Sequence, residues 1–215
     1  MRPRTAFVVA ITGHRPNRMH IGEAAVARRL CLVLAALRSG SRGAKRVAVS
    51  ALAEGSDRLF ASAALDLGFE LRALLPFPSA HYETTFGNAA TTIVYRELLA
   101  RAATITELPG ALADSKAAYE AVGRATVEAA DVLVTVWDGK GAAGRGGTPE
   151  IIEYALARRI PVIWIDAARL RLPLLIAAPT ASGARVIPLA KLAGRARTLT
   201  RRRIEALGAR ITSRP

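Results

Sequence analysis

The fold is decided by three consecutive segments: Asp131-Val-Leu-Val-Thr-Val-Trp-Asp138, Gly139-Lys-Gly-Ala-Ala-Gly-Arg-Gly-Gly-Thr-Pro-Glu150 and Ile151-Ile-Glu-Tyr-Ala-Leu-Ala-Arg-Arg159. The first is apolar, the second is rich in glycine and the third has helical apolar spacing, so they predict a strand, a tight loop and a helix. Thr148 suits the N-cap and Pro149 the first helical position. The free amides of that helix would face the loop, which suits a phosphate; a flexible surface loop is the alternative interpretation.

Apolar runs and helical patterns alternate along the whole chain. Short apolar runs predict strands at residues 6–11, 46–50, 70–75, 104–108, 132–137 and 162–165, with a short edge strand at 185–187. Helical periodicity lies between them, at residues 21–37, 57–67, 91–102, 115–129, 151–159 and 189–207. The strands lack in-out alternation, which is typical of a parallel sheet covered on both faces. We therefore expect an α/β protein with an open, doubly wound, mainly parallel sheet and helices on both faces.

The bulk composition limits the class of protein. A chain of 215 residues with 51% hydrophobic content can form one domain with a buried core. Cys31 is the only cysteine, lies between two leucines and is expected to be a buried thiol. No disulfide can form within the chain, no signal peptide is visible and no apolar run is long enough for a transmembrane segment, so a cytoplasmic location is expected.

The net charge of +14 is unevenly distributed. Half of it falls in the last 25 residues, where eight basic side chains stand against one acid, Glu205. This change predicts a Rossmann-like domain over residues 1–190 and a basic C-terminal helix or tail over residues 191–215. The segment from Lys191 to Arg214 can bind nucleic acid, and a solvated helix face is the alternative interpretation.

Three polar, glycine-bearing loops follow predicted strands and would meet at one edge of a parallel sheet. The candidate ligand-binding residues in them are Thr12, Gly13, His14, Arg15, Glu54, Gly55, Asp57, Asp138, Gly144, Arg145, Gly146, Gly147, Thr148 and Glu150. Thr12 and Arg15 are suited to a phosphate. Asp138 and Glu150 can accept ribose hydroxyls, although Glu150 can instead serve the helix dipole. Asp57 fits an N-cap better than a ribose contact.

Several other site classes find no support in the sequence. Three scattered histidines and one cysteine give no ligand spacing, so no metal is expected. No G-x-S-x-G nucleophile motif, no Walker phosphate loop and no G-x-G-x-x-G after the first strand is present. The chain is therefore expected to hold no cofactor and to perform no ordinary dehydrogenase or serine hydrolase chemistry.

Three motifs together resemble the SLOG superfamily, the Rossmann-like group that joins the Lonely-guy (LOG) phosphoribohydrolases with the Smf/DprA DNA-processing proteins. They are Ile11-Thr-Gly-His-Arg-Pro16, Ser50-Ala-Leu-Ala-Glu-Gly-Ser-Asp-Arg58 and Trp137-Asp-Gly-Lys with Gly144-Arg-Gly-Gly-Thr148. The resemblance spans roughly residues 6–165. It implies a Rossmann-like fold, a nucleotide-like or ADP-ribose-type ligand and homodimers or larger homo-oligomers, as in stand-alone or sensor-type members.

The third motif departs from that of the Lonely-guy enzymes. Ile151 stands three positions after Thr148, where those enzymes carry their catalytic glutamate, and Glu150 is one position early. Our first interpretation is therefore a sensor module that binds a phosphorylated ribose. An N-glycosidase of nucleoside monophosphates, with Glu150 or Glu54 as the catalytic carboxylate, is the second interpretation. Single-stranded DNA binding, as in the DprA relatives, is the third.

Overall fold

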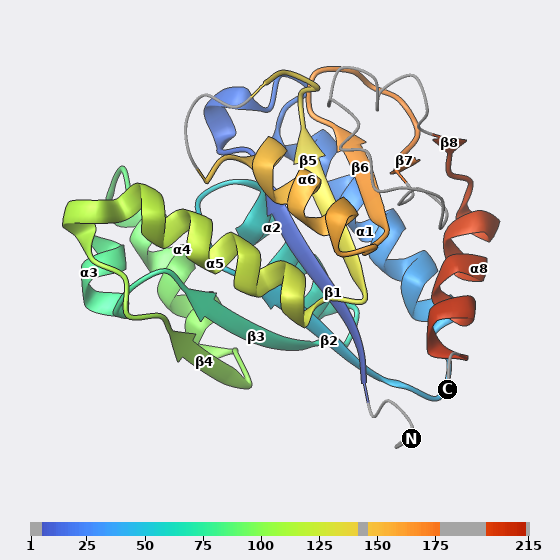
Figure 1. The fold of residues 1–215 in the computed structure, drawn as a ribbon, viewed down its shortest axis with the longest axis horizontal. Coiled ribbons are helices and arrows are strands. Elements are labelled where there is room, and N and C mark those ends of the chain that lie inside the picture. Colours follow the sequence, from blue (N-terminus) through green and yellow to red (C-terminus); the bar gives the residue numbers. More distant parts are fainter. Residues whose placement is uncertain (1–5, 142–145, 177–196, 214–215) are drawn as a thin grey trace.

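The computed structural model describes residues 6–141, 146–176 and 197–213 (Figure 1). Its strands form one sheet in the order β4-β3-β2-β1-β5-β6-β7-β8. The strands are β1 (Ala6–Gly13), β2 (Lys45–Ser50), β3 (Glu70–Leu75), β4 (Thr104–Glu107), β5 (Val132–Trp137), β6 (Val162–Asp166), β7 (Leu174–Ile176) and β8 (Arg197–Thr198). Strands β1 to β6 pair in parallel, whereas β7 and β8 pair antiparallel at one edge. The predicted mainly parallel sheet is confirmed.

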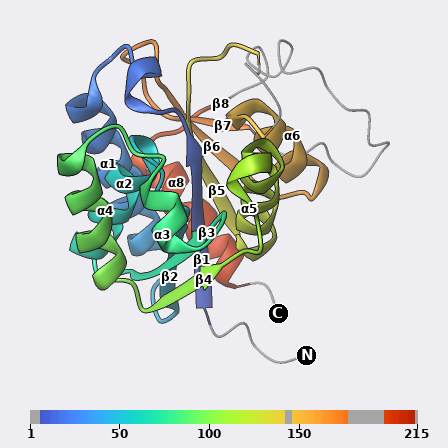
Figure 2. The ribbon, with the colours of Figure 1, turned by 90° about the vertical axis from the view of Figure 1, so that its left-hand side faces the viewer.

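Helices cover both faces of this sheet (Figure 2). They are α1 (Glu23–Gly40), α2 (Ser56–Asp66), α3 (Ser79–Glu83), α4 (Ala89–Ala100), α5 (Ser115–Ala129), α6 (Thr148–Ala157) and α8 (Arg201–Thr212), with short 3-10 turns η1 (Pro16–Arg18) and η2 (Leu112–Asp114). Helices α1, α2, α4 and α8 lie on one face, and α5 and α6 lie on the other (Figure 2). The predicted doubly wound α/β class is therefore confirmed.

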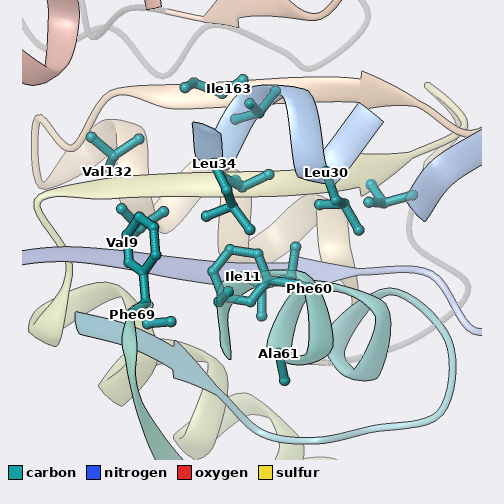
Figure 3. Close-up of a cluster of buried hydrophobic side chains, with 14 of the residues drawn as sticks. Val9, Ile11, Leu30, Leu34, Phe60, Ala61, Phe69, Val132 and Ile163 are labelled. Carbon is teal, nitrogen blue, oxygen red and sulfur yellow. The ribbon is translucent and has the colours of Figure 1, made fainter. Parts of the chain in front are cut away.

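The main core lies between the sheet and the α1–α2 face (Figure 3). Val9 and Ile11 of β1 meet Leu30 and Leu34 of α1 and Phe60 of α2, and all five side chains are almost fully buried. Residues 30 and 34 lie one helical turn apart, so they share the face that α1 turns toward the sheet. Burial of such side chains contributes about 1.5–3 kcal/mol each.

The direction of the strand order changes at β1. Strands β2, β3 and β4 follow one another on one side of β1, while β5 and β6 lie on the other side. The loops that leave the carboxyl ends of β1 and β5 therefore diverge to opposite faces and leave a crevice between them. This crevice is the place where an open α/β sheet offers room for a ligand.

The structure differs from the sequence expectations in several elements. Cys31 is exposed, because it lies on α1 outside the stripe of buried leucines and valines. Residues 79–83, which lie outside the predicted strands and helices, form helix α3. The predicted edge strand 185–187 lies outside the described residues. Within the described ranges, no helix combines the length and the apolar character that crossing a membrane requires.

The C-terminal helix α8 packs closely on α1; of the predicted helix 189–207, residues 189–196 lie outside the described residues. Helix α8 starts at Arg201, after the short strand β8, and buries Ile204, Leu207 and Ile211 in the main core. A Cβ on Gly40 of α1 would lie 2.0 Å from the backbone oxygen of Glu205, so only glycine permits this close crossing. The described residues 197–213 thus share both the sheet and the core with the rest of the protein.

Candidate functional site

A cavity of about 530 Å³ opens at the carboxyl edge of the sheet, at the crevice between β1 and β5. The predicted residues that line it are Thr12, Gly13, His14, Arg15, Asp57, Gly146, Gly147 and Thr148. The predicted residues that do not line it are Glu54, Gly55, Asp138 and Glu150. Gly144 and Arg145 lie outside the described residues. All three predicted loops therefore meet at one cavity, but their carboxylates, except for Asp57, do not face it.

The loop after β1 connects the neighbouring strand with helix α2. The backbone N–H of His14 donates to the carbonyl of Val136 at 2.9 Å, and the N–H of Ser56 donates to the carbonyl of His14 at 3.2 Å. Gly13 sits where these segments converge, since a Cβ there would lie 2.6 Å from the Ser56 hydroxyl oxygen and 2.8 Å from the Val136 carbonyl oxygen. The backbone at Gly13 is thereby fixed at the mouth of the cavity.

Gly55 sets the start of helix α2. Its φ of +92° lies in the region that glycine alone adopts easily, and a Cβ would lie 2.8 Å from the carbonyl oxygen of His14. The Ser50 hydroxyl supports the same turn, because it donates to the carbonyl of Asp57 at 3.1 Å and accepts from the N–H of Leu52 at 3.1 Å. These contacts direct the amino end of α2 toward the cavity, where the helix dipole is positive.

Asp57 is the one carboxylate among the described residues that lines the cavity. Asp57 is only 6% exposed, and burial raises the pKa of its carboxyl to about 7. Hydrogen bonds from the backbone N–H groups of Ala53 and Ala51 and from the Ser56 hydroxyl favour the charged form and oppose this rise. Near neutral pH this side chain can therefore accept or donate a proton at the cavity wall.

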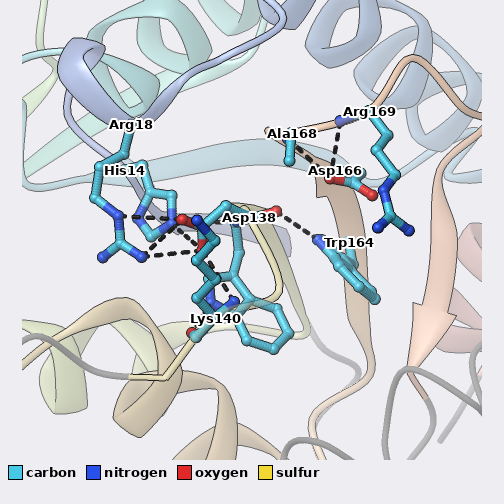
Figure 4. A network of polar contacts seen from close by, with 9 residues as sticks. His14, Arg18, Asp138, Lys140, Trp164, Asp166, Ala168 and Arg169 are labelled. Carbon is cyan, nitrogen blue, oxygen red and sulfur yellow. Dashed lines mark hydrogen bonds and ion pairs between the residues drawn. The ribbon is translucent and has the colours of Figure 1, made fainter.

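Asp138 is held in a polar network beneath the cavity (Figure 4). Arg18 binds its two carboxylate oxygens through Nη2 at 3.0 and 2.7 Å, and Nε2 of His14 lies 3.0 Å from Oδ1. Burial opposes ionisation of Asp138, but hydrogen bonds from His14, Lys140 and Arg18 outweigh it and lower the pKa of the carboxyl. Burial lowers the pKa of His14 although the neighbouring Asp138 carboxylate raises it, and the Arg18 guanidinium supplies a positive charge opposite Asp138.

Glu54 faces away from the cavity and joins two loops. Its carboxylate lies 3.2 Å from Nη1 of Arg15 and accepts the backbone N–H of Gly87 at 3.1 Å. Burial raises the pKa of Glu54, but the Gly87 and Thr91 hydrogen bonds and nearby arginines reverse this effect and lower it. Glu54 thus orients Arg15, whose side chain is 45% exposed and lines the cavity.

Glu150 also makes a structural contact. Its carboxylate accepts the backbone N–H of Gly146, so it closes the described end of the glycine-rich loop on the first turn of α6. The predicted N-cap at Thr148 is shifted by one residue: Thr148 is the first residue of α6, and Gly147, with extended dihedral angles, is the N-cap. The amino end of α6 still lines the cavity, through Thr148 and Pro149.

Several residues that line the cavity were absent from the sequence prediction. They are contributed by the 3-10 turn η1, by α3 and by α5: Asn17, Arg18, Tyr82, Lys116, Tyr119, Val122, Gly123 and Thr126. Polar side chains on one face of α5, such as Lys116 and Thr126, were the available signal, because a helix beside the crevice turns one stripe toward it. Their association with the loops depends on the packing of α5 across the sheet, which the sequence pattern does not specify.

The charge of the cavity wall favours an anion. Arg15, Arg18 and Lys116 line it, whereas Asp57 is its single described carboxylate. The amino ends of α2 and α6 add partial positive charge from two directions. Within the described residues no group of three or more His, Cys, Asp or Glu side chains is arranged to hold a metal ion. The arrangement is able to bind a phosphate and to place a titratable carboxyl beside it.

Comparison with known proteins gives structural matches. Neither a family model nor a curated protein sequence matches this chain. DNA processing protein A (DprA) from Streptococcus pneumoniae matches with a TM-score of 0.50 and 18% identity, over 77% of this chain and 52% of that chain. This chain therefore corresponds to about half the length of that protein.

Two further solved structures are similar at a lower level. DNA processing protein A from Helicobacter pylori, described for its single-stranded DNA binding mode, matches with a TM-score of 0.46 and 18% identity, over 78% of this chain and 68% of that one. The protein TM1055 matches with a TM-score of 0.42 and 15% identity, over 73% and 72%. Among these three structures, the S. pneumoniae protein reaches a TM-score of 0.50, and at 18% identity it supports the fold alone. The chain therefore shares a Rossmann-like fold with the S. pneumoniae protein, and this is the fold that its three motifs predict.

Proposed function

We propose that the protein binds a nucleotide or an ADP-ribose-type ligand, a phosphorylated ribose, in the 530 Å³ cavity at the carboxyl edge of the sheet. The observation that carries this proposal is the convergence of two helix amino ends and three basic side chains on one cavity at the switch point of the sheet. The volume lies within the range of about 300–1,000 Å³ that is common for small-molecule sites.

The lining of the cavity combines groups suited to a phosphate with aromatic side chains. Gly146, Gly147 and Thr148, after β5, offer backbone amides and a hydroxyl to a phosphate. Tyr82 follows β3, on the other side of β1 in the strand order, and Tyr119 packs near it, with both rings in edge contact with Phe77. A ligand that combines a phosphate with a flat, partly apolar group fits this lining.

The positions of the carboxylates favour binding over glycosidic cleavage. Glu150 and Glu54 are hydrogen-bonded to loop amides and do not line the cavity. Cleavage of an N-glycosidic bond requires a carboxylate close to the ribose, and Asp57 is the described carboxylate in reach. We therefore propose a sensor or carrier role, and we assign no catalytic function to Glu54 or Glu150.

A thermal-shift panel tests the proposal. The full chain is heated with AMP, other nucleoside monophosphates, NAD, ADP-ribose, cyclic ADP-ribose or a short single-stranded oligonucleotide. A ligand that binds only the folded state raises Tm, by an amount that corresponds to about 2.7 kcal/mol at a hundredfold excess over Kd. We expect a selective rise with one ribose phosphate and no accumulation of free base during the incubation.

Two variants locate the bound ligand. Arg15→Ala should weaken binding about tenfold or more, because a charge-assisted phosphate contact is lost from the cavity mouth. Arg28→Ala is the matched control, since Arg28 is an exposed arginine on α1 that does not line the cavity. Equal loss in the two variants, or no Tm rise with any ribose phosphate, contradicts the proposal. Release of free base would instead favour the glycosidase interpretation.

A further inference from the structure

A second cavity, of about 370 Å³, is lined by four arginines at the opposite edge of the sheet. Its lining residues are Ala35, Arg38, Ser39, Arg42, Arg46 and Arg201. Arg46 is the second residue of β2, so this cavity lies at the amino edge of the strands, whereas the first cavity lies at the carboxyl edge. No residue lines both cavities.

The four arginines come from different parts of the chain. Arg38 lies in the last turn of α1, Arg42 in the turn that follows, and Arg46 at the start of β2. Arg201 begins α8, which crosses α1 at Gly40 and Gly208 without space for a further side-chain carbon at Gly40. The cluster is therefore built by the tertiary fold and is not a run of charges on a single exposed helix.

The positive charge of the cluster is almost uncompensated. All 17 acidic residues of the chain lie in the described ranges, and the one salt bridge of these four arginines in those ranges joins Nε of Arg201 to Oε1 of Glu205 at 2.9 Å. Nε of Arg46 is buried without a hydrogen-bond partner. The nearest strand carries Glu70, but its carboxylate is already bound by Lys45 and Arg72.

We propose that this arginine cluster binds the linked phosphate groups of a small oligophosphate. Guanidinium groups bind phosphate oxygens in pairs, and Arg46, which lines the cavity, has a buried Nε without a hydrogen-bond partner. Four guanidinium charges face a single carboxylate, so one phosphate, with about two negative charges, would leave an excess of positive charge. Two or three linked phosphates balance the cluster better.

The shape of the site favours a compact anion over an extended backbone. The four guanidinium groups reach one cavity from different elements, so they can surround one compact group of phosphates. A nucleic-acid backbone spreads its charges along a line, and a stripe of basic residues would fit it better. Because free oligophosphates and nucleic acids share the phosphate chemistry, the experiment includes both.

Calorimetric titration of the full chain with inorganic triphosphate at about 0.1 M salt tests the proposal. Wild type should bind, and Arg38→Gln combined with Arg42→Gln should weaken binding about tenfold or more. Arg28→Gln combined with Arg101→Gln is the matched control: it removes the same charge from exposed positions outside the cluster and should leave Kd within about twofold.

Three outcomes would overturn the inference. The first is that wild type fails to bind triphosphate. The second is that the cluster variant binds triphosphate as well as wild type does. The third is that the control variant loses as much affinity as the cluster variant. A single-stranded oligonucleotide that binds through Arg38 and Arg42 while triphosphate does not would assign these arginines to nucleic acid and contradict the compact anion. Circular dichroism of each variant confirms that the comparison is made between folded proteins.

Discussion

Asp57 and Arg58 are neighbours in the first turn of α2, and both are buried, but they face different parts of the molecule. Asp57 lines the cavity. Arg58 donates from Nε to the carbonyl of Leu52 at 2.9 Å and from Nη1 to the carbonyl of Thr91 at 2.6 Å, with its guanidinium 4.3 Å from the centre of the Phe86 ring. One charge is thus placed at the ligand site, and the other joins α2 to the start of α4.

Asp57→Asn should change how stability depends on pH. Burial raises the pKa of Asp57 in the folded state to about 7, while an unfolded carboxyl ionises near 3.8. The folded state therefore favours the protonated carboxyl. The contribution of Asp57 protonation to the free energy of unfolding is complete at pH 3–4 and is lost as pH rises toward 7. The variant, which stays neutral, should gain stability relative to wild type across this interval, by an amount on the order of a few kcal/mol.

Urea denaturation of both proteins at pH 4, 5.5, 7 and 8.5 measures this difference. The gap between variant and wild type should widen up to about pH 7 and then remain constant. A gap that does not vary with pH would show that the carboxyl titrates normally in the folded protein. Other titrating groups, including His14, are common to the two proteins and cancel in the difference.

Arg58→Met should destabilise the protein by roughly 2–4 kcal/mol. The methionine fills part of the space but leaves the Leu52 and Thr91 carbonyl oxygens without their donor, and the contact with Phe86 loses its charge. The free energy of unfolding in urea checks this value. Arg101→Met, at a residue with a 3.8 Å surface ion pair to Asp66, should change it by less than about 1 kcal/mol.

At the scale of elements, glycine determines how the loops reach the cavity. Gly22 and Gly55 both have positive φ, of +82° and +92°, but only Gly55 is crowded: a Cβ there would lie 2.7 Å from Met19 Cε and 2.8 Å from the His14 carbonyl oxygen. Gly22 has open space around it. The two residues therefore separate the cost of the backbone conformation from the cost of the close contact.

Gly22→Ala should cost roughly 2 kcal/mol, because its φ of +82° and ψ of 150° lie in a region that is essentially restricted to glycine. Gly55→Ala should cost clearly more, about 3 kcal/mol or above, because the backbone of the first loop must move. Thermal or urea unfolding compares the two variants, and ligand titration of the folded fraction should show weaker binding only for Gly55→Ala. Equal costs would mean that the loops adapt freely.

The strands and long helices could be predicted from the sequence because their signals are local. Continuous apolar runs identified β1, β2, β3, β5 and β6, and helical spacing identified α1, α4 and α5. Helix α3 and the short strands β7 and β8 were missed, since they have only a few residues and depend on the packing that surrounds them. Cys31 was wrongly placed in the core, because neighbouring leucines say little about which side of a helix a residue occupies.

The cavity could be predicted only in part, for a related reason. Glycines, Thr12, Arg15 and Thr148 follow strands directly, so their place at the carboxyl edge follows from the order of elements. The direction of a loop carboxylate is not local: Asp138 turns to Arg18, 120 residues away in the chain. Tyr82 and Lys116 enter the cavity from helices whose positions depend on tertiary packing. Glu54 and Asp138 lie in loops and Glu150 lies in the first turn of α6, but the sequence pattern does not specify the groups that their carboxylates bind.

At the scale of the whole molecule, the C-terminal helix stabilises the domain. Leu207→Ala should reduce the free energy of unfolding by about 2–5 kcal/mol, because Leu207 is 5% exposed and packs in the main core. Arg210→Ala, on the exposed side of the same helix, should change it by less than about 0.5 kcal/mol. Urea denaturation of both variants makes the comparison, and equal effects would mean that α8 does not hold the fold.

The packing of α8 in the main core determines how the basic C-terminal segment can be studied. A chain that ends before α8 loses Ile204, Leu207 and Ile211 from the core, so loss of nucleic-acid binding after truncation would not separate contact from unfolding. Replacing the exposed Arg202 and Arg210 with glutamine keeps the buried face of α8 and lowers the charge. The salt dependence of oligonucleotide affinity then measures the contribution of these arginines alone.

The position of β2 separates the two cavities by a fixed length. Arg46 near its start lines one cavity and Ala51 just beyond its end lines the other, five residues apart, which is roughly 17 Å along a strand. A mononucleotide is too short to occupy both cavities, so the two proposed sites would hold separate ligands. Saturating one cavity with its ligand should leave the ligand concentration that half-saturates the other cavity unchanged, unless β2 shifts as a rigid element between them. A change in that concentration would show that β2 couples binding at the two cavities.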